Sequence, residues 1–118
     1  MARTSQTTQA ITLSGLVPTM TEPVAGQGNG DIIDTGRVFL VVNNGSSADI
    51  TVTVITPVQI DSLDLEDLTV TVAAGATEYI GPIIPRVFAQ PNSSADAGRA
   101  YVEYTGTMTG VTRAVVSL

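Results

Sequence analysis

A short acidic stretch holds the densest group of side chains in the chain that could do chemistry. Its four carboxylates fall within seven residues, at Asp61, Asp64, Glu66 and Asp67. Paired carboxylates act as general acid and base in hydrolases, and clustered carboxylates bind Ca²⁺. The stretch lacks the glycine that a calcium loop needs for its sharp turn, and Leu63 and Leu65 interrupt it. We therefore expect a solvated connection whose leucines turn inward, with an adventitious calcium site as the weaker alternative.

Other routes to catalysis are closed by composition. The chain has no His, Lys or Cys, so the usual bases for a serine or threonine nucleophile are absent. The imidazole and thiolate ligands of zinc, iron and copper are absent for the same reason. The remaining formal hydrolytic pair is Glu103 with Asp61 or Asp64, and few aromatic residues are available to line a cleft for it. We predict that the protein is not an enzyme and binds no cofactor.

Two strands joined by a turn organise the chain. Residues 38–42 are an unbroken apolar run rich in β-branched types, which predicts a strand covered on both faces. Residues 50–54 alternate strictly between apolar and polar, which predicts a strand with one wet face. Asn43, Asn44 and Gly45 between them tolerate positive φ, so we expect the two strands to form a hairpin.

Further strand and turn signals recur along the chain. Residues 69–72 and 78–80 predict a second hairpin, residues 86–89 a short strand, and residues 111–118 a final strand with Leu118 packed at its end. No helical periodicity is present. The pattern predicts an all-β fold, an antiparallel β-sandwich (jelly-roll or Ig-like) of about seven to eight strands with an extended N-terminal arm.

The first 30 residues differ from the rest. Prolines and a glycine run at 26–30 break regular structure there, and this run matches neither the P-loop nor the dinucleotide fingerprint. We expect a flexible connection at the run, an extended or flexible arm over residues 1–30, and a single sandwich domain over residues 31–118. The apolar residues of the arm are Ile11, Leu13, Leu16 and Val17. They fit either an edge strand on the chain's own domain or an extension that pairs with a neighbouring subunit.

Composition also limits the partners. The chain of 118 residues has room for one domain, and its net charge is −6 with five scattered arginines. A nucleic-acid surface needs clustered cations, so we expect no nucleic-acid binding. No run approaches the ~20 apolar residues of a membrane span, and none follows Arg3 as in a secretory signal. We expect no membrane association, and a cytosolic product unless it leaves with a larger assembly.

Tyr79 and Tyr101 are the residues that could stack on a sugar ring. Both lie among alternating strand residues, which favours core or edge packing. A carbohydrate-binding or receptor-binding sandwich is therefore an alternative rather than the main expectation.

Residues 36–44, which read Gly-Arg-Val-Phe-Leu-Val-Val-Asn-Asn, resemble a known family together with residues 50–57, 69–82 and 111–118. The family is that of the small head decoration, or cement, proteins of tailed bacteriophages and prophages. The resemblance covers residues 32–118 and is carried by strand and turn patterns. It does not extend to the acidic stretch, to the loop at 90–99 or to the arm.

The resemblance implies a structural virion protein that is made in the host cytoplasm and binds the outside of a phage capsid. Its partners would be the major capsid protein and sister copies in a homotrimer, and it would stabilise the shell by bridging capsid subunits. A head-completion, tail-tube or fibre-base subunit is the alternative within the same particle. The residues expected at the contact with a neighbouring subunit or the shell are Ile11, Leu13, Leu16, Val17, Arg37 and Arg86, the arginines pairing with carboxylates.

Overall fold

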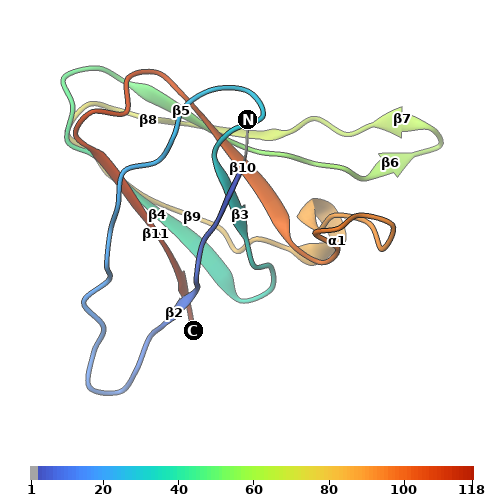
Figure 1. Cartoon of the computed structure of the whole chain (residues 1–118), viewed down its shortest axis with the longest axis horizontal. Coiled ribbons are helices and arrows are strands. Elements are labelled where there is room, and N and C mark those ends of the chain that lie inside the picture. Colours follow the sequence, from blue (N-terminus) through green and yellow to red (C-terminus); the bar gives the residue numbers. More distant parts are fainter. Residues whose placement is uncertain (1–2) are drawn as a thin grey trace.

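The computed structural model describes residues 3–118, apart from the side chains of Ile60 and Asp64, and is a sandwich of two sheets (Figure 1). The first sheet has the order β1-β3-β10-β5-β8, with bounds Thr4–Ser5, Asp31–Ile33, Ala100–Thr105, Ile50–Val54 and Leu68–Val72. The second sheet has the order β2-β11-β4-β9, with bounds Gln9–Ala10, Val111–Ser117, Val38–Asn44 and Thr77–Ile80. A separate ribbon pairs β6 (Gln59–Ile60) with β7 (Leu63–Asp64), and a helical turn, α1, spans Pro85–Phe88. No helix in this described part is long and apolar enough to cross a membrane.

The predicted all-β sandwich is confirmed, with differences in detail. Within residues 3–118 the two sheets hold nine strands, more than expected, because the arm contributes β1 and β2. Both arm strands pair parallel, β1 with β3 and β2 with β11, so the sheets are mixed rather than wholly antiparallel. The strand expected at residues 86–89 is wrong, because most of that segment lies in α1. Pro85 favours this helical start, since its ring presets a helical φ and it has no N–H to leave unpaired.

The predicted hairpin between residues 38–42 and 50–54 is also wrong. β4 pairs with β11 and β9 in the second sheet, whereas β5 pairs with β10 and β8 in the first. The turn between them therefore crosses from one sheet to the other, as do the β8–β9 and β10–β11 turns. The second predicted hairpin, between residues 69–72 and 78–80, is wrong for the same reason. A hairpin and a crossing turn share the same alternation and turn residues, and the burial of both inner faces decides which strands pair.

The strand order distinguishes the two predicted kinds of sandwich. From β3 to β11 the chain changes sheet at nearly every connection, and the two consecutive strands of the main sheets that share a sheet are β5 and β8. An Ig-like sandwich keeps several pairs of consecutive strands in one sheet, so the order departs from an Ig-like sandwich.

β5 and β8 form a long hairpin, although the sequence pattern predicted other partners for both strands. They pair along their whole length, and the chain continues beyond the sandwich as the β6–β7 ribbon (Figure 1). At the ribbon tip Asp61 and Ser62 have φ values of 53° and 66°, as a two-residue hairpin turn requires. The acidic stretch is therefore a projecting ribbon, and Leu63, expected to turn inward, is 71% exposed.

The core between the sheets is aliphatic. Alternate residues of β4 and β5 point into it and are buried, namely Val38, Leu40, Val42, Ile50, Val52 and Val54. β4 is also buried on its outer face at Val41, as its unbroken apolar run predicts, whereas the threonines of β5 are half-exposed. The burial predicted for each of these two strands is thus correct, although their pairing is not.

Asn44 holds the corner where the β4–β5 and β8–β9 turns meet. Its amide nitrogen donates to the carbonyls of Ala48 (2.8 Å) and Val72 (2.9 Å), and its amide oxygen accepts from the N–H of Ser46 (3.1 Å). Its own backbone N–H donates to the carbonyl of Ala76 (2.8 Å). The side chain is fully buried, so these bonds replace its contacts with water.

The arm is extended and pairs with both sheets, through β1 and then β2; its first two residues lie outside the described part of the chain. The glycine run at 26–30 lies packed against β10 rather than as a free connection. The Gly26 N–H donates to the carbonyl of Tyr104 (3.0 Å). A Cβ on Gly30 would lie 2.1 Å from the carbonyl oxygen of Val102, so only glycine fits there.

Replacing Asn44 with alanine should lower the free energy of unfolding by about 2–3 kcal/mol, because the carbonyls of Ala48 and Val72 lose buried donors. Urea denaturation followed by circular dichroism measures this change. Asn43→Ala is the matched control, since the Asn43 side chain donates to the exposed Thr77 hydroxyl (2.8 Å) and should matter little. Equal losses for the two variants would contradict the role of Asn44.

Candidate functional site

The outer face of the second sheet is apolar and partly covered by the arm. Val41 of β4 and Ala114 and Val116 of β11 point outward and are buried there. Leu16 and Met20 of the arm pack over them. In the single chain the arm therefore lies on its own domain, and the part of this face beyond the arm stays open.

The open part of this face is a groove of about 720 Å³, called the main groove below. It is lined by Gly36, Arg37, Phe39, Tyr79, Gly81, Pro82, Ile84, Pro85 and Leu118. Tyr79 and Leu118 are 70% and 76% exposed, and the ring centroids of Tyr79 and Phe39 lie 6.0 Å apart. Large exposed apolar side chains gathered in one place mark an interaction surface.

The linker after β9 forms one wall of the main groove. A Cβ on Gly81 would lie 2.7 Å from the Cβ of Phe39, so glycine allows the linker to approach β4 closely. The Ile83 N–H donates to the carbonyl of Val38 (2.9 Å), which extends this attachment. Pro82 and Pro85 in the same linker have no N–H, so they leave no unpaired donor at the groove wall.

A smaller groove of about 240 Å³ connects the main groove to the arm. Phe39 and Tyr79 line both grooves, and Ile11, Leu16 and Pro18 of the arm line the smaller one. The apolar surface is therefore continuous from the arm to the C-terminal residue.

Two arginines have no side-chain partner among the described residues, and one of them lines the main groove. Arg37 lines it, and Arg86 follows the lining residue Pro85. Both are exposed, and neither has an ion pair or side-chain hydrogen bond among the described residues. The other arginines are paired: Arg3 with Glu103 (2.9 Å), Arg99 with Asp34 (3.2 Å) and Arg113 with Asp31 (2.6 Å). Among the described residues, one of the two arginines without an ion pair thus lines the groove, and the other is next in sequence to a lining residue.

The structure places most of the predicted contact residues on this surface. Ile11 and Leu16 line the smaller groove, and Arg37 lines the main one. Leu13 and Val17 are almost completely exposed. They belong to the loop at 11–20, called the arm loop below, which follows β2 and extends beyond the edge of the sheets (Figure 1). Partner binding by these residues stays a prediction.

Tyr79 and Leu118, which line the main groove, were not among the predicted contact residues. The sequence favoured core or edge packing for Tyr79. The residue lies on the edge strand β9, but most of its side chain is exposed. The packed terminus expected at Leu118 is wrong, because that residue follows the end of β11 and lies in the groove wall. A signal for Tyr79 was present, since its neighbour Ile80 fills the core and alternation places Tyr79 on the opposite face.

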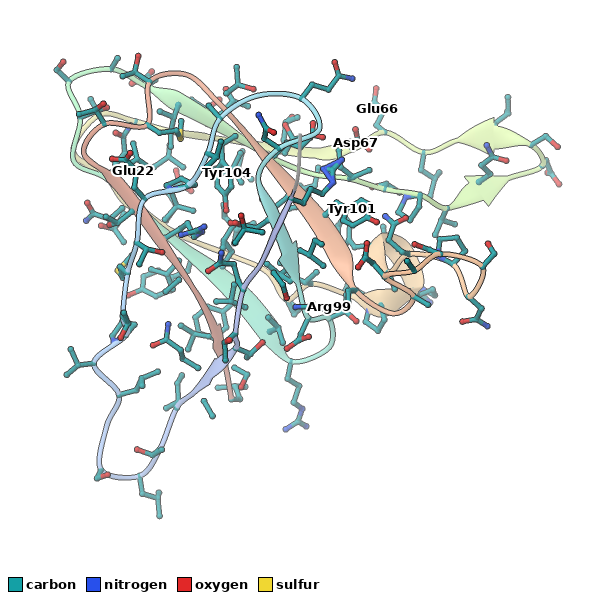
Figure 2. All side chains as sticks on the ribbon, viewed as in Figure 1. Glu22, Glu66, Asp67, Arg99, Tyr101 and Tyr104 are labelled. Atoms are coloured by element: carbon teal, nitrogen blue, oxygen red, sulfur yellow. The ribbon has the colours of Figure 1, made fainter. Side chains whose placement is uncertain are left out.

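The carboxylates singled out for chemistry do not converge. Glu103 lies in β10, where it pairs with Arg3 and accepts from the N–H of Gly28 (3.0 Å). Asp61 lies at the ribbon tip, and Glu66 points away from the sandwich near the ribbon base (Figure 2). The side chain of Asp64 lies outside the described set. Among the side chains that are described, no group of three or more acidic residues is placed to hold a metal ion.

Tyr101, the second aromatic residue considered for sugar binding, is held by polar contacts. Its hydroxyl donates to Asp96 (2.6 Å), and this bond raises the pKa of the phenol. The Arg3 guanidinium lies 4.3 Å from the ring centroid, a distance typical of a cation–π contact. The ring face over which Arg3 lies is therefore occupied within the chain itself.

A buried polar cluster lies between the sheets. Arg113 of β11 donates from Nε and Nη2 to the two carboxylate oxygens of Asp31 in β3 (2.6 and 2.7 Å). The hydroxyl of Tyr104 in β10 donates to the same carboxylate, and Arg113 also donates to the carbonyl of Thr21 in the arm (3.0 Å). Figure 2 shows Tyr104 inside the sandwich. The cluster is sealed from solvent, so it joins two sheets and the arm rather than presenting groups to a substrate.

The cluster shifts the pKa values of its members. Burial and the adjacent Asp31 charge raise the pKa of Tyr104 well above its usual 10.0. For Arg113, burial alone would lower the pKa, but the bonds to Asp31 outweigh it and raise the value. The phenol thus stays protonated and the guanidinium stays charged, which preserves every bond of the cluster.

Comparisons with protein-family models, with curated proteins and with solved structures found no match. The resemblance of residues 32–118 to head decoration proteins therefore stays a prediction, and the function is inferred first from the chain's own residues.

The free energy of unfolding should fall as the pH rises above 10, by about 1.4 kcal/mol per pH unit, because unfolded Tyr104 ionises while the folded protein holds its proton. Below pH 10 this contribution is fully present. Urea denaturation at a series of pH values measures it, and Tyr104→Phe should show a shallower decline. Tyr79→Phe, at an exposed ring, should decline as the wild type does. Identical declines for wild type and Tyr104→Phe would contradict the assignment.

Proposed function

We propose that the protein is a structural virion protein that binds the outside of a phage capsid and stabilises the shell by bridging capsid subunits. The resemblance of residues 32–118 to phage head decoration proteins supports the role. The observation that carries the proposal is the exposed apolar surface of the loop at 11–20 together with the smaller groove beside it.

The arm is built to present its loop at a fixed place. β2 holds the loop at its start, through pairing with β11, and the Thr21–Arg113 backbone pair holds it at its end. Leu13 and Val17 are exposed between these two attachments. Burying a side chain of this size contributes about 1.5–3 kcal/mol, and preorganisation reduces the entropy lost on binding.

A cement protein does not need high affinity in each copy. Many weak contacts act together when copies occupy neighbouring positions on one shell. The acidic balance of the chain, −6 overall, suits the outer surface of a shell that holds packaged DNA within. The major capsid protein is the proposed partner of the arm loop.

Two alternatives have an observation in their favour. The apolar surface would serve equally in a ring of head-completion, tail-tube or fibre-base subunits, and the copy number per particle separates a ring from a shell. The exposed ring of Tyr79 beside the main groove favours a carbohydrate- or receptor-binding sandwich, which a glycan array tests.

The double variant Leu13→Asp with Val17→Asp should bind empty capsid shells at least about tenfold more weakly, because two apolar contacts would be replaced by charges. Co-sedimentation of the purified protein with shells measures occupancy. Substitution is preferable to deletion of the arm, since Thr4–Ser5 and Gln9–Ala10 pair with the two sheets.

The matched control for this experiment is Val24→Asp, an exposed apolar residue of the arm outside the loop. It should sediment with shells as the wild type does. Full occupancy by the double variant would show that the arm loop is not the anchor.

A further inference from the structure

The β6–β7 ribbon exposes an apolar residue among acidic ones. The ribbon extends from the first sheet away from the sandwich (Figure 1), and Leu63 next to its turn is 71% exposed. Asp61 at the turn and Glu66 beyond β7 are exposed and have no ion pair among the described residues. From Gln59 to Leu68 the sequence holds four carboxylates and no cation.

The main groove complements this ribbon both in its apolar surface and in the sign of its charge. Its floor and walls are apolar, with Tyr79, Ile84 and Leu118 exposed. Arg37 lines it without an ion pair among the described residues, and Arg86, likewise without one, follows the lining residue Pro85 in the sequence. An apolar residue flanked by carboxylates therefore matches an apolar groove lined by the Arg37 guanidinium group, and such matching selects partners and sets their orientation.

The ribbon does not fill the main groove of its own chain. Leu63 is exposed, and the ribbon projects from the edge of the first sheet, whereas the groove lies on the outer face of the second. We propose that the ribbon of one copy docks in the main groove of a second copy of this chain. Leu63 enters the groove, and the ribbon carboxylates pair with Arg37 and Arg86.

This contact is heterologous, because it joins two different surfaces of the same chain. The two end copies keep a free ribbon and a free groove until the arrangement closes into a ring, so the contact predicts a closed oligomer such as a trimer, or else an open chain. The inference goes beyond the proposed function, because it concerns the contact between copies and holds whether or not the partner of the arm loop is a capsid.

The test uses two variants that each remove one side of the contact. Leu63→Asp disables the ribbon, and Arg37→Glu with Leu118→Asp disables the groove. Sedimentation velocity of the wild type should show an oligomer, and each variant alone should associate at least about tenfold more weakly. An equimolar mixture should form a one-to-one dimer and stop there, because a single intact ribbon meets a single intact groove.

Leu13→Asp is the matched control, with the same substitution at an exposed leucine of the arm loop. It should self-associate as the wild type does, so a defect in shell binding can be told apart from a defect between copies. Three results would each overturn the proposal: a monomeric wild type, full association of Leu63→Asp, or no dimer in the mixture.

Should a variant fail to fold by circular dichroism, a salt titration of the wild type decides. Association that weakens as NaCl rises supports the ion pairs, and association that is unchanged contradicts them.

Discussion

The buried ion pair between Asp31 and Arg113 determines how the two sheets and the arm fit together. Removing two charges from water costs several kcal/mol, which is offset only when every polar atom finds a partner. Here Asp31 accepts from Arg113 and Tyr104, and Arg113 also bonds the arm at Thr21. A slip of β11 by one residue would turn Arg113 to the outer face and leave Asp31 buried without its cation. The pair therefore selects one register of β11.

That register also sets the position of the interaction surface. Arg113 points inward from β11, whereas the next residue, Ala114, and then Val116 point outward and form the floor beneath the arm. The positions of the arm loop and of both grooves therefore depend on β11, the same strand that carries Arg113 of the buried pair. The ribbon extends from the opposite sheet, which the pair joins through Asp31. One interior contact accordingly holds the two proposed binding regions in a fixed relation.

Local patterns in the sequence located most of the long strands but not their partners. The run at 38–42 and the alternation at 50–54 gave the correct burial of β4 and β5, yet their pairing depends on strands far along the chain. The buried cluster joins residues 82 positions apart, so Arg113 could not be distinguished from a surface cation. The exposed apolar residues of the arm were visible in the sequence. The main groove was not, because it is assembled from three separate segments.

Hydrogen–deuterium exchange of the protein, free and mixed with empty phage capsid shells, tests one claim above all. That claim is that the protein acts by binding other subunits through the arm loop and the outer face of the second sheet. Slower exchange of backbone amides at 11–20 on binding, with the buried strands β4 and β5 unchanged, is the predicted result. Binding that leaves the amides at 11–20 unchanged while protecting the outer face of the first sheet would contradict it.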